Sequence, residues 1–273
     1  MKYQGVDKIM AIYASADWHG CYWIWEQIKN ILQPDDTLYF LGDACDRSDD
    51  GWQIIKELFA DPRIIYLKGN HEDLLIKAIG NMTPDSFNDD VFYWDRAMDL
   101  WFYNGGEPTY NAIMKDNTLT ASQKIYIIHQ LKELPFAAGY INKKGQQVQL
   151  SHSGYDDFDL GDEEQFIWDR NHLMFYDTWN GKNNEIIVHG HTPIELMIKE
   201  QQNNAEWLIE KHKLEGVLGD HFVEPQPWDG HSAYWYAKNH KVNIDTGAVW
   251  NNISILLNLD TWEEIVLETP KAV

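Results

Sequence analysis

Short apolar runs alternate with amphipathic stretches over the first seventy residues of the chain. Three runs have the composition of buried strands, and each is followed by a stretch in which apolar residues recur at helical spacing. Because this alternation is typical of βαβ units, it predicts an α/β fold with a buried, largely parallel sheet. The strands are expected at Lys8–Ser15, Thr37–Leu41 and Arg63–Leu67, and the helices at Tyr22–Leu32, Trp52–Phe59 and Glu72–Ile79.

The middle of the chain follows a different pattern. Asp85–Leu134 is rich in aromatic residues at helical spacing, so we expect a helical insertion over about residues 81–134. Lys199–Lys238 is polar and rich in histidine, and we expect a long surface loop there, within a second insertion at about 195–240. No clear linker is visible, so residues 1–273 are expected to form a single domain. Later strands are expected at Gln147–Leu150, Glu185–Val188, Lys241–Ile244 and Ile253–Leu257.

Charge and composition exclude several classes of function. The 43 acidic and 22 basic side chains of the 273 residues give a net charge of −21, which argues against a broad nucleic-acid-binding face. No apolar run is long enough to predict a membrane span. Only two cysteines are present, which excludes a disulfide framework and favours a reducing, cytoplasmic location. We expect a monomer that binds neither nucleic acid nor membrane.

Acidic, histidine and asparagine residues follow the ends of the predicted strands. Ligands of α/β sheets bind beyond the carboxyl ends of the strands, so these side chains are expected to meet at one edge. Each short motif alone is more often a turn or a polar pair, but their joint occurrence favours a functional site. The residues in question are Asp17, His19, Asp43, Asn70, His152 and His191.

The side-chain types at this edge suit divalent metal ions. Carboxylate, amide and imidazole groups bind Mn, Fe, Zn or Mg, and no cluster of thiolates competes with them. Two ions about 3.5–4 Å apart suit in-line attack on phosphorus. One set of ligands can consist of Asp17, His19 and Asp43, and a second of Asp43, Asn70, His152 and His191, so that Asp43 bridges the two.

These motifs resemble those of the calcineurin-like metallophosphoesterases. The matching segments, in order, are Asp17-Trp18-His19-Gly20, Gly42-Asp43-Ala44-Cys45-Asp46-Arg47, Gly69-Asn70-His71-Glu72, His152 near Gly154, and Gly190-His191. The Asp46-Arg47 pair is similar to the serine/threonine phosphoprotein phosphatase branch, and the nearest resemblance is to phosphatases of the bacteriophage lambda type. The resemblance implies a four-layer sandwich in which two mixed β-sheets are flanked by helices.

The resemblance also implies a role for each residue. It implies a dinuclear-metal-dependent phosphomonoester hydrolase, in which a metal-bridging hydroxide attacks phosphorus and His71 protonates the leaving oxygen. Asp46 would hydrogen-bond to His71, while Arg47, Arg170 and Asn70 would bind the phosphate. The two ions are expected to be Mn²⁺, with Fe, Zn, Ni or Mg as alternatives. The substrate would be a phosphorylated protein or a small phosphoester.

Three other functions stay open from the sequence. The nearest is hydrolysis of diadenosine tetraphosphate or another nucleotide at the same site. A second is a phosphodiesterase, and a third is a metal-binding scaffold without catalysis, against which the complete ligand set and His71 argue. His189 lies two residues before His191 and is expected to be a neighbour of the site and not a ligand.

Overall fold

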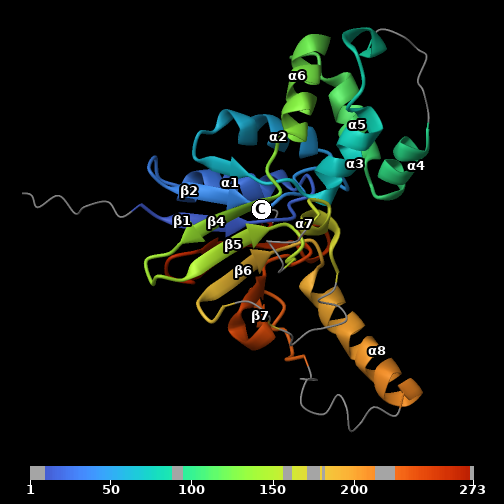
Figure 1. The fold of residues 1–273 in the computed structure, drawn as a ribbon. Helices are drawn as coiled ribbons and strands as arrows, with labels where there is room; N and C mark the ends of the chain where they lie inside the picture. The colour runs from blue at the N-terminus through green and yellow to red at the C-terminus, as the bar shows by residue number, and fades with distance from the viewer. Residues whose placement is uncertain are drawn as a thin grey trace, which may run out of the picture.

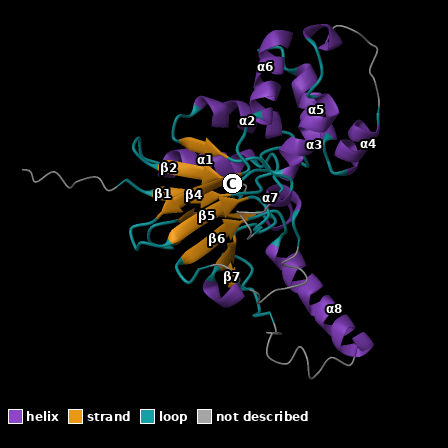
Figure 2. Cartoon of the chain, in the orientation of Figure 1, coloured by secondary structure: helices purple, strands orange, loops and turns teal. Residues whose placement is uncertain are grey.

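A computed structural model describes residues 10–87, 95–155, 162–170, 179, 182–212 and 225–270, with the side chains of 204–212 excepted. The start of the first predicted strand and residues 213–224 of the second predicted insertion lie outside the described residues. Two five-stranded sheets, each with parallel and antiparallel pairs, form the centre of the molecule (Figures 1 and 2).

The first sheet has the strand order β10-β9-β1-β2-β3. Strands β1, β2 and β3 run parallel, as the βαβ pattern of the sequence predicted, whereas β9 and β10 pair antiparallel. Helices α1 (Tyr22–Ile31) and α2 (Gly51–Ala60) provide the connections between the parallel strands. The strands are β1 (Ile12–Ser15), β2 (Thr37–Phe40), β3 (Ile64–Tyr66), β9 (Ile253–Asn258) and β10 (Glu264–Glu268).

The second sheet has the order β4-β5-β6-β8-β7. Its three central strands are parallel, and the two edge strands pair antiparallel with them. The arrangement therefore consists of two mixed sheets, as the resemblance implied, whereas the apolar pattern of the first seventy residues predicted only the parallel part of the first sheet. The strands are β4 (Ala137–Ile141), β5 (Gln147–Ser151), β6 (Glu185–His189), β7 (Tyr234–Tyr236) and β8 (Lys241–Asn243).

Apolar side chains form successive layers. One buried cluster joins Ile28 of α1 and Ile55 of α2 to Phe40 of the first sheet. A second cluster lies between the sheets and includes Leu257 of β9 and Val188 of β6. On the outer side of the second sheet, the first turns of α8 (Ile194–His212) pack on Tyr234 and Tyr236 of β7. The two sheets are thus flanked by helices, as the resemblance implied.

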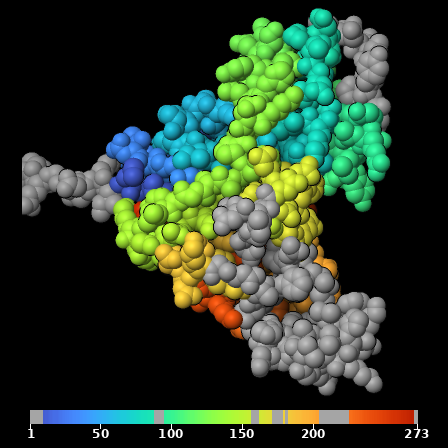
Figure 3. All heavy atoms as spheres, in the orientation of Figure 1, coloured from blue at the N-terminus to red at the C-terminus, as the bar shows by residue number. Residues whose placement is uncertain are grey.

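Among the described residues between β3 and β4 are four helices and a short 3₁₀ turn, η1 (Pro84–Phe87). This part of the chain stands out from the sheets (Figures 1 and 3). Helices are present where the aromatic periodicity of the middle segment predicted them. Thr120 begins one of them with a capping box in which its hydroxyl accepts a hydrogen bond from the backbone N–H of Gln123. The helices are α3 (Asn70–Ile79), α4 (Arg96–Tyr103), α5 (Glu107–Lys115) and α6 (Ala121–Lys132).

The expected surface loop from Lys199 was wrong for residues 199–212. They continue α8, which begins directly after Pro193 and extends away from the sheets (Figure 1). Proline suits the position before a helix, and the Glu, Lys, Gln and Leu residues that follow are good helix formers. Polar composition alone does not distinguish an exposed helix from a loop. No helix of the described residues is long and apolar enough to cross a membrane.

Candidate active site

The loops that follow the parallel strands bring the predicted site residues together at one edge of the sheets, beside α3 and α7 (Gln165–Trp168; Figure 2). The loop after β1 carries Asp17 and His19, and the loop after β2 carries Asp43. Backbone hydrogen bonds join these two loops, since the N–H groups of Asp17 and His19 donate to the carbonyls of Gly42 and Asp43. All six predicted metal ligands are buried.

Asp43 is the centre of this cluster. Its Oδ2 atom lies 3.6 Å from Nε2 of His19, 3.4 Å from Nε2 of His152 and 3.9 Å from Nε2 of His71. Its other oxygen, Oδ1, accepts a hydrogen bond of 2.9 Å from the backbone N–H of His71. One carboxylate oxygen is therefore within reach of three ring nitrogens, which come from two loops and from the first turn of α3.

The first residue of α3, Asn70, joins His152 to a further histidine, His191. Its Oδ1 atom lies 2.9 Å from Nε2 of His152 and 2.8 Å from Nδ1 of His191. The opposite nitrogen of the His152 ring, Nδ1, lies 2.8 Å from the carbonyl oxygen of Leu41, and Nδ1 of His19 lies 3.0 Å from the carbonyl oxygen of Cys45. A backbone acceptor at one ring nitrogen fixes the orientation of the ring and directs the other nitrogen inward.

Asp17 lies on the other side of the cluster. Both of its carboxylate oxygens accept hydrogen bonds from the backbone N–H of His191, at 3.0 and 3.1 Å. Gly190 permits this approach, because a Cβ atom there would lie only 1.8 Å from Oδ2 of Asp17. Gly69 does the same for Asp43, since its Cβ would lie 2.2 Å from Oδ1 of that carboxylate.

Six predicted site residues adopt the left-handed backbone conformation that favours glycine. Non-glycine residues rarely have positive φ, although Asp, Asn and His tolerate it best. The strand-end loops thus turn abruptly and direct successive side chains into one small volume. The residues and their φ values are Asp17 (56°), His19 (43°), Asp43 (62°), Asp46 (71°), Arg47 (67°) and His191 (72°).

Burial and mutual charge shift the pKa values of the cluster in opposite directions. Burial, followed by the neighbouring carboxylate of Asp245, raises the pKa of Asp17 well above its usual range. Burial also disfavours ionised Asp43, but His152 and His71 outweigh it and lower that pKa well below the usual range. Burial lowers the pKa of His152, yet Asp43 and Asp17 outweigh this effect and raise it to about 9. Several buried carboxylates therefore share one site, an arrangement that a cation would stabilise.

A buried carboxylate–imidazole pair lies next to this cluster. Nδ1 of His71 donates a hydrogen bond of 2.7 Å to Oδ2 of Asp46. The same oxygen accepts a hydrogen bond of 2.9 Å from the indole N–H of Trp101 on α4. The backbone N–H of Asp46 donates to the hydroxyl of Thr109 on α5 at 2.8 Å. The helices of the middle segment thus position the pair, a role that the sequence analysis did not assign to them.

Arg47 and Arg170 both contact histidine side chains of the cluster. Guanidinium nitrogens of Arg47 lie 2.6 Å from Nε2 of His19 and 3.0 Å from Nε2 of His71, and Nε of Arg170 donates to Nε2 of His191 at 3.1 Å. Burial, followed by the charge of Arg47, lowers the pKa of Arg170. Two guanidinium groups that repel each other across a partly buried site would be stabilised by an anion between them.

Sequence reasoning missed the role of Glu72. Its buried carboxylate accepts hydrogen bonds of 2.8–2.9 Å from the backbone N–H groups of Asp43, Ala44 and Gly69, and from the hydroxyl of Tyr66. It therefore holds the loop that carries Asp43 against the start of α3. Its place in the Gly-Asn-His-Glu motif was the available signal, but the motif alone does not reveal these partners.

His189 lies beside the cluster and faces away from it. Its Nε2 atom lies 2.7 Å from the hydroxyl of Tyr236, and its Nδ1 atom lies 3.0 Å from the carbonyl oxygen of Gly190. Burial lowers its pKa to about 3, so the ring is neutral at physiological pH. Its position agrees with that of a neighbour of the site.

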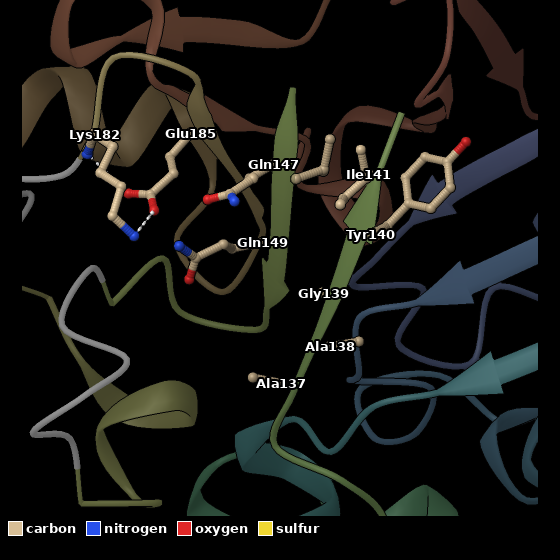
Figure 4. Close-up of a pocket in the computed structure, with 10 residues that line it drawn as sticks. Ala137, Ala138, Gly139, Tyr140, Ile141, Gln147, Gln149, Lys182 and Glu185 are labelled. Atoms are coloured by element: carbon tan, nitrogen blue, oxygen red, sulfur yellow. Dashed lines mark hydrogen bonds and ion pairs between the residues drawn. The ribbon is translucent and has the colours of Figure 1, made fainter. Parts of the chain in front are cut away.

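A separate hollow of about 550 Å³ lies along the edge strand β4 and its neighbour β5 (Figure 4). It is lined mainly by small and amide side chains, and its charged residues, Lys182 and Glu185, pair with each other at 3.1 Å. None of the predicted site residues lines this hollow, so it contributes nothing to the chemistry of the cluster.

The donors of the cluster fit divalent metal ions. Two groups of three have ligand atoms that all lie within 4.8 Å of one another, namely His19, Asp43 and His71, and Asp17, Asp43 and His152. Asp43 belongs to both groups, as expected of a bridging carboxylate. The predicted ligand sets share Asp17, His19, Asp43 and His152 with these groups but contain Asn70 and His191 in place of His71, and the predicted division stays a prediction. The chemistry of the donors, carboxylate and imidazole without thiolate, is that of Mn, Fe, Zn or Mg sites.

Comparisons with known proteins agree with this chemistry. The family model of calcineurin-like phosphoesterases matches residues 10–225, and the chain therefore belongs to that family. The family hydrolyses phosphoesters and uses divalent metal ions. A search of curated proteins gives no match.

Several solved structures are similar to this chain at low sequence identity. One, provisionally described as a diadenosine tetraphosphatase, has a TM-score of 0.55 and 13% identity over 97% of this chain and 96% of that one. A metallophosphoesterase from Sphaerobacter thermophilus has a TM-score of 0.47 and 10% identity over 96% and 89%. A serine/threonine phosphatase from Saccharomyces cerevisiae has a TM-score of 0.45 and 11% identity over 97% and 81%. At such identities the first similarity supports the fold alone.

Proposed function

We propose that the chain hydrolyses phosphate monoesters with two divalent metal ions, and that its substrates are phosphoserine and phosphothreonine residues of proteins. The observation that carries the proposal is the contact of His71 with both Asp46 and Arg47, at 2.7 and 3.0 Å. A proton donor and a phosphate-binding guanidinium are thereby held side by side, at the edge of a cluster of metal-ligand side chains.

The residues that would hold the ions are Asp17, His19, Asp43, Asn70, His152 and His191, with Mn²⁺ as the proposed metal. When bound, the ions would activate water as the nucleophile and neutralise charge on the phosphoryl oxygens. The side chains of the protein bind and orient the substrate. Arg47 and Arg170 bind the phosphoryl oxygens through N–H groups and orient the ester for in-line attack.

His71 would protonate the departing alkoxide. The oxygen of a serine or threonine side chain is a poor leaving group, so transfer of a proton from Nε2 lowers the barrier to its departure. Asp46 accepts the hydrogen bond from Nδ1, which fixes the ring so that Nε2 is directed at the substrate.

The test compares kcat/KM in Mn²⁺ for a phosphoserine or phosphothreonine peptide and for diadenosine tetraphosphate. A large preference for the peptide is the expected result. A large preference for the dinucleotide would be consistent with the metal site but would overturn the assignment of the substrate.

We also propose that the protein is a cytoplasmic monomer that acts on phosphoproteins. Size-exclusion chromatography with light scattering tests the oligomeric state.

A further inference from the structure

A pocket of about 360 Å³ opens beside the two arginines of the site. Its lining includes Arg47, Arg170 and His191, so it adjoins the place where the phosphoryl group would bind. Glu195 and Lys199 from α8, and Trp250 from α9 (Ala248–Asn251), also line it. A volume of this size suits a small organic group. The pocket therefore extends the site outward beyond the phosphate.

Trp250 is a large aromatic side chain that the protein leaves in contact with solvent. It is 59% exposed, whereas Ala248 in the same turn is buried. Gly247 and Asn252, which flank the short helix, both have positive φ, and the backbone N–H of Trp250 donates to the carbonyl of Gly247 at 2.9 Å. The backbone that carries the indole is thus ordered by a closed turn, which lowers the entropy cost of stacking a second ring on the indole.

The indole also contacts the catalytic machinery directly. The guanidinium carbon of Arg47 lies 5.0 Å from the centre of the Trp250 ring, a distance at which cation and ring attract. A group that leaves the phosphorus atom held by Arg47 would therefore start next to the indole. Arg47, Arg170 and Lys199 outnumber Glu195 among the charged residues of the pocket, so anionic substrates are attracted locally despite the net charge of −21.

We propose that this pocket is a leaving-group subsite, in which Trp250 stacks on an aromatic ring that lies beyond the scissile P–O bond. The proposal rests on the proposed phosphomonoester hydrolysis. Two sources supply such a ring: an aromatic residue next to the phosphorylated residue of a peptide, and the base of a nucleotide. Both would place a flat, apolar surface against the exposed indole, whereas a leaving group without a ring would not.

Pairs of substrates that differ only in an aromatic group measure the effect of the ring on hydrolysis. Adenosine 5′-monophosphate and ribose 5-phosphate share the same primary phosphate ester and differ in the base. Two phosphoserine peptides, with phenylalanine or alanine after the phosphorylated residue, make the equivalent pair. With the Mn²⁺-loaded full chain, kcat/KM is measured for all four substrates, and the ratio within each pair reports the contribution of the ring.

In at least one pair we expect the aromatic member to have the higher kcat/KM by about 10-fold, in line with the stacking of one ring. Trp250→Ala is expected to bring that ratio close to one, and Trp250→Phe to retain most of it. Tyr126→Ala is the matched control, because Tyr126 on α6 is a similarly exposed aromatic, at 64%, and does not line the pocket. This control is expected to leave the ratios unchanged.

The outcomes are decisive. The pair that shows the Trp250-dependent ratio identifies the source of the ring. Ratios close to one in both pairs for the unsubstituted protein would overturn the subsite. An equal loss for aromatic and aromatic-free substrates in Trp250→Ala would also overturn it, since Trp250 would then act only by supporting Arg47. No hydrolysis of any of the four substrates would overturn the proposed function itself, and the subsite with it.

Discussion

The indole N–H of Trp101 donates a hydrogen bond to the same oxygen of Asp46 that accepts the ring proton of His71. Trp101 and Asp46 are 55 positions apart in the sequence, and both are buried. Two donors on one carboxylate oxygen fix its orientation and share its negative charge. Helix α4 is therefore connected by a single hydrogen bond to the group that would orient the general acid.

Replacement of Trp101 by phenylalanine is predicted to lower kcat for a phosphoserine peptide about 10-fold. Phenylalanine fills most of the same space, but it cannot donate to Asp46, and a lost hydrogen bond to a charged group is worth about 1.5 kcal/mol. Steady-state kinetics with the peptide and with 2,4-dinitrophenyl phosphate check this, because the second substrate releases a phenolate that needs no proton.

Trp52→Phe is the matched control for that experiment. Trp52 is also a buried tryptophan whose indole donates to a carboxylate, that of Asp116, at 2.8 Å, but it lies away from the site. Trp52→Phe should change the stability of the protein without changing the ratio of the kcat values for the two substrates. Equal losses for both substrates in Trp101→Phe would indicate a general structural defect and contradict the positioning role.

His71→Asn is predicted to reduce kcat on phosphopeptides by about 10²–10⁴-fold, the usual contribution of a general acid. Asparagine retains a polar group but cannot supply a proton at neutral pH. With 2,4-dinitrophenyl phosphate the loss should be much smaller. Unchanged turnover of the phosphopeptide would refute the assignment of His71 as proton donor.

Glu72→Ala is predicted to destabilise the protein by about 3 kcal/mol, because three buried backbone N–H groups and the hydroxyl of Tyr66 lose their acceptor. Asp43 would lose its fixed position, so bound metal should fall as well. Urea unfolding measures the stability, and elemental analysis of the purified protein measures the metal. A variant with full stability and full metal content would exclude the supporting role of Glu72.

Acid stability is predicted to depend on Glu57. Burial disfavours its ionised form, but hydrogen bonds from Lys29, Gln53, Tyr22 and Trp25 outweigh burial and lower its pKa from 4.5 to about 2. Because the pKa of Glu57 is lower in the folded state than in the unfolded state, its ionised carboxylate stabilises the fold at pH values above about 4.5. This contribution to the free energy of unfolding is lost as the pH falls towards 2. Glu57→Gln should therefore lose about 1–2 kcal/mol at pH 7 and show a flatter decline between pH 4.5 and 2. Urea unfolding at a series of pH values measures both effects, and parallel pH profiles for the two proteins would contradict the assignment.

Removal of metal ions by a chelator is predicted to abolish hydrolysis and to lower the melting temperature. The buried carboxylates of Asp17 and Asp43 repel each other without a cation, and an ion that binds only the folded state stabilises it. Added Mn²⁺ should restore both properties, and Asp43→Asn should greatly weaken the restoration. A melting temperature that does not respond to any divalent ion would count against the metal site.

The sequence predicted those parts of the molecule that depend on local pattern. The parallel strands β1 to β3 and the residues that follow them were predicted because apolar runs and strand-end motifs lie within a few positions of each other. Strand β4, with the sequence Ala-Ala-Gly-Tyr-Ile, lacks a clear apolar run, and it becomes a strand only by pairing with β5. Strands β7 and β10 were likewise missed.

The contacts of the site that the sequence could not reveal are those between distant segments. The hydrogen bond between Trp101 and Asp46 and the cation–ring contact of Arg47 with Trp250 depend on how the helices pack on the loops. In the sequence, thirteen tryptophans were indistinguishable from packing residues. Only the three-dimensional arrangement shows that Trp101 and Trp250 contact residues of the site.

The left-handed backbone at six site residues has a consequence for the design of stable variants. Each such residue costs on the order of 1 kcal/mol relative to glycine or to a relaxed backbone, so the site lowers the stability of the fold that carries it. Glycine at Arg47, for example, would relieve strain while it removes a phosphate-binding group. A selection for thermostability alone would therefore favour substitutions in these loops, and each gain in melting temperature there would come with a loss of catalysis.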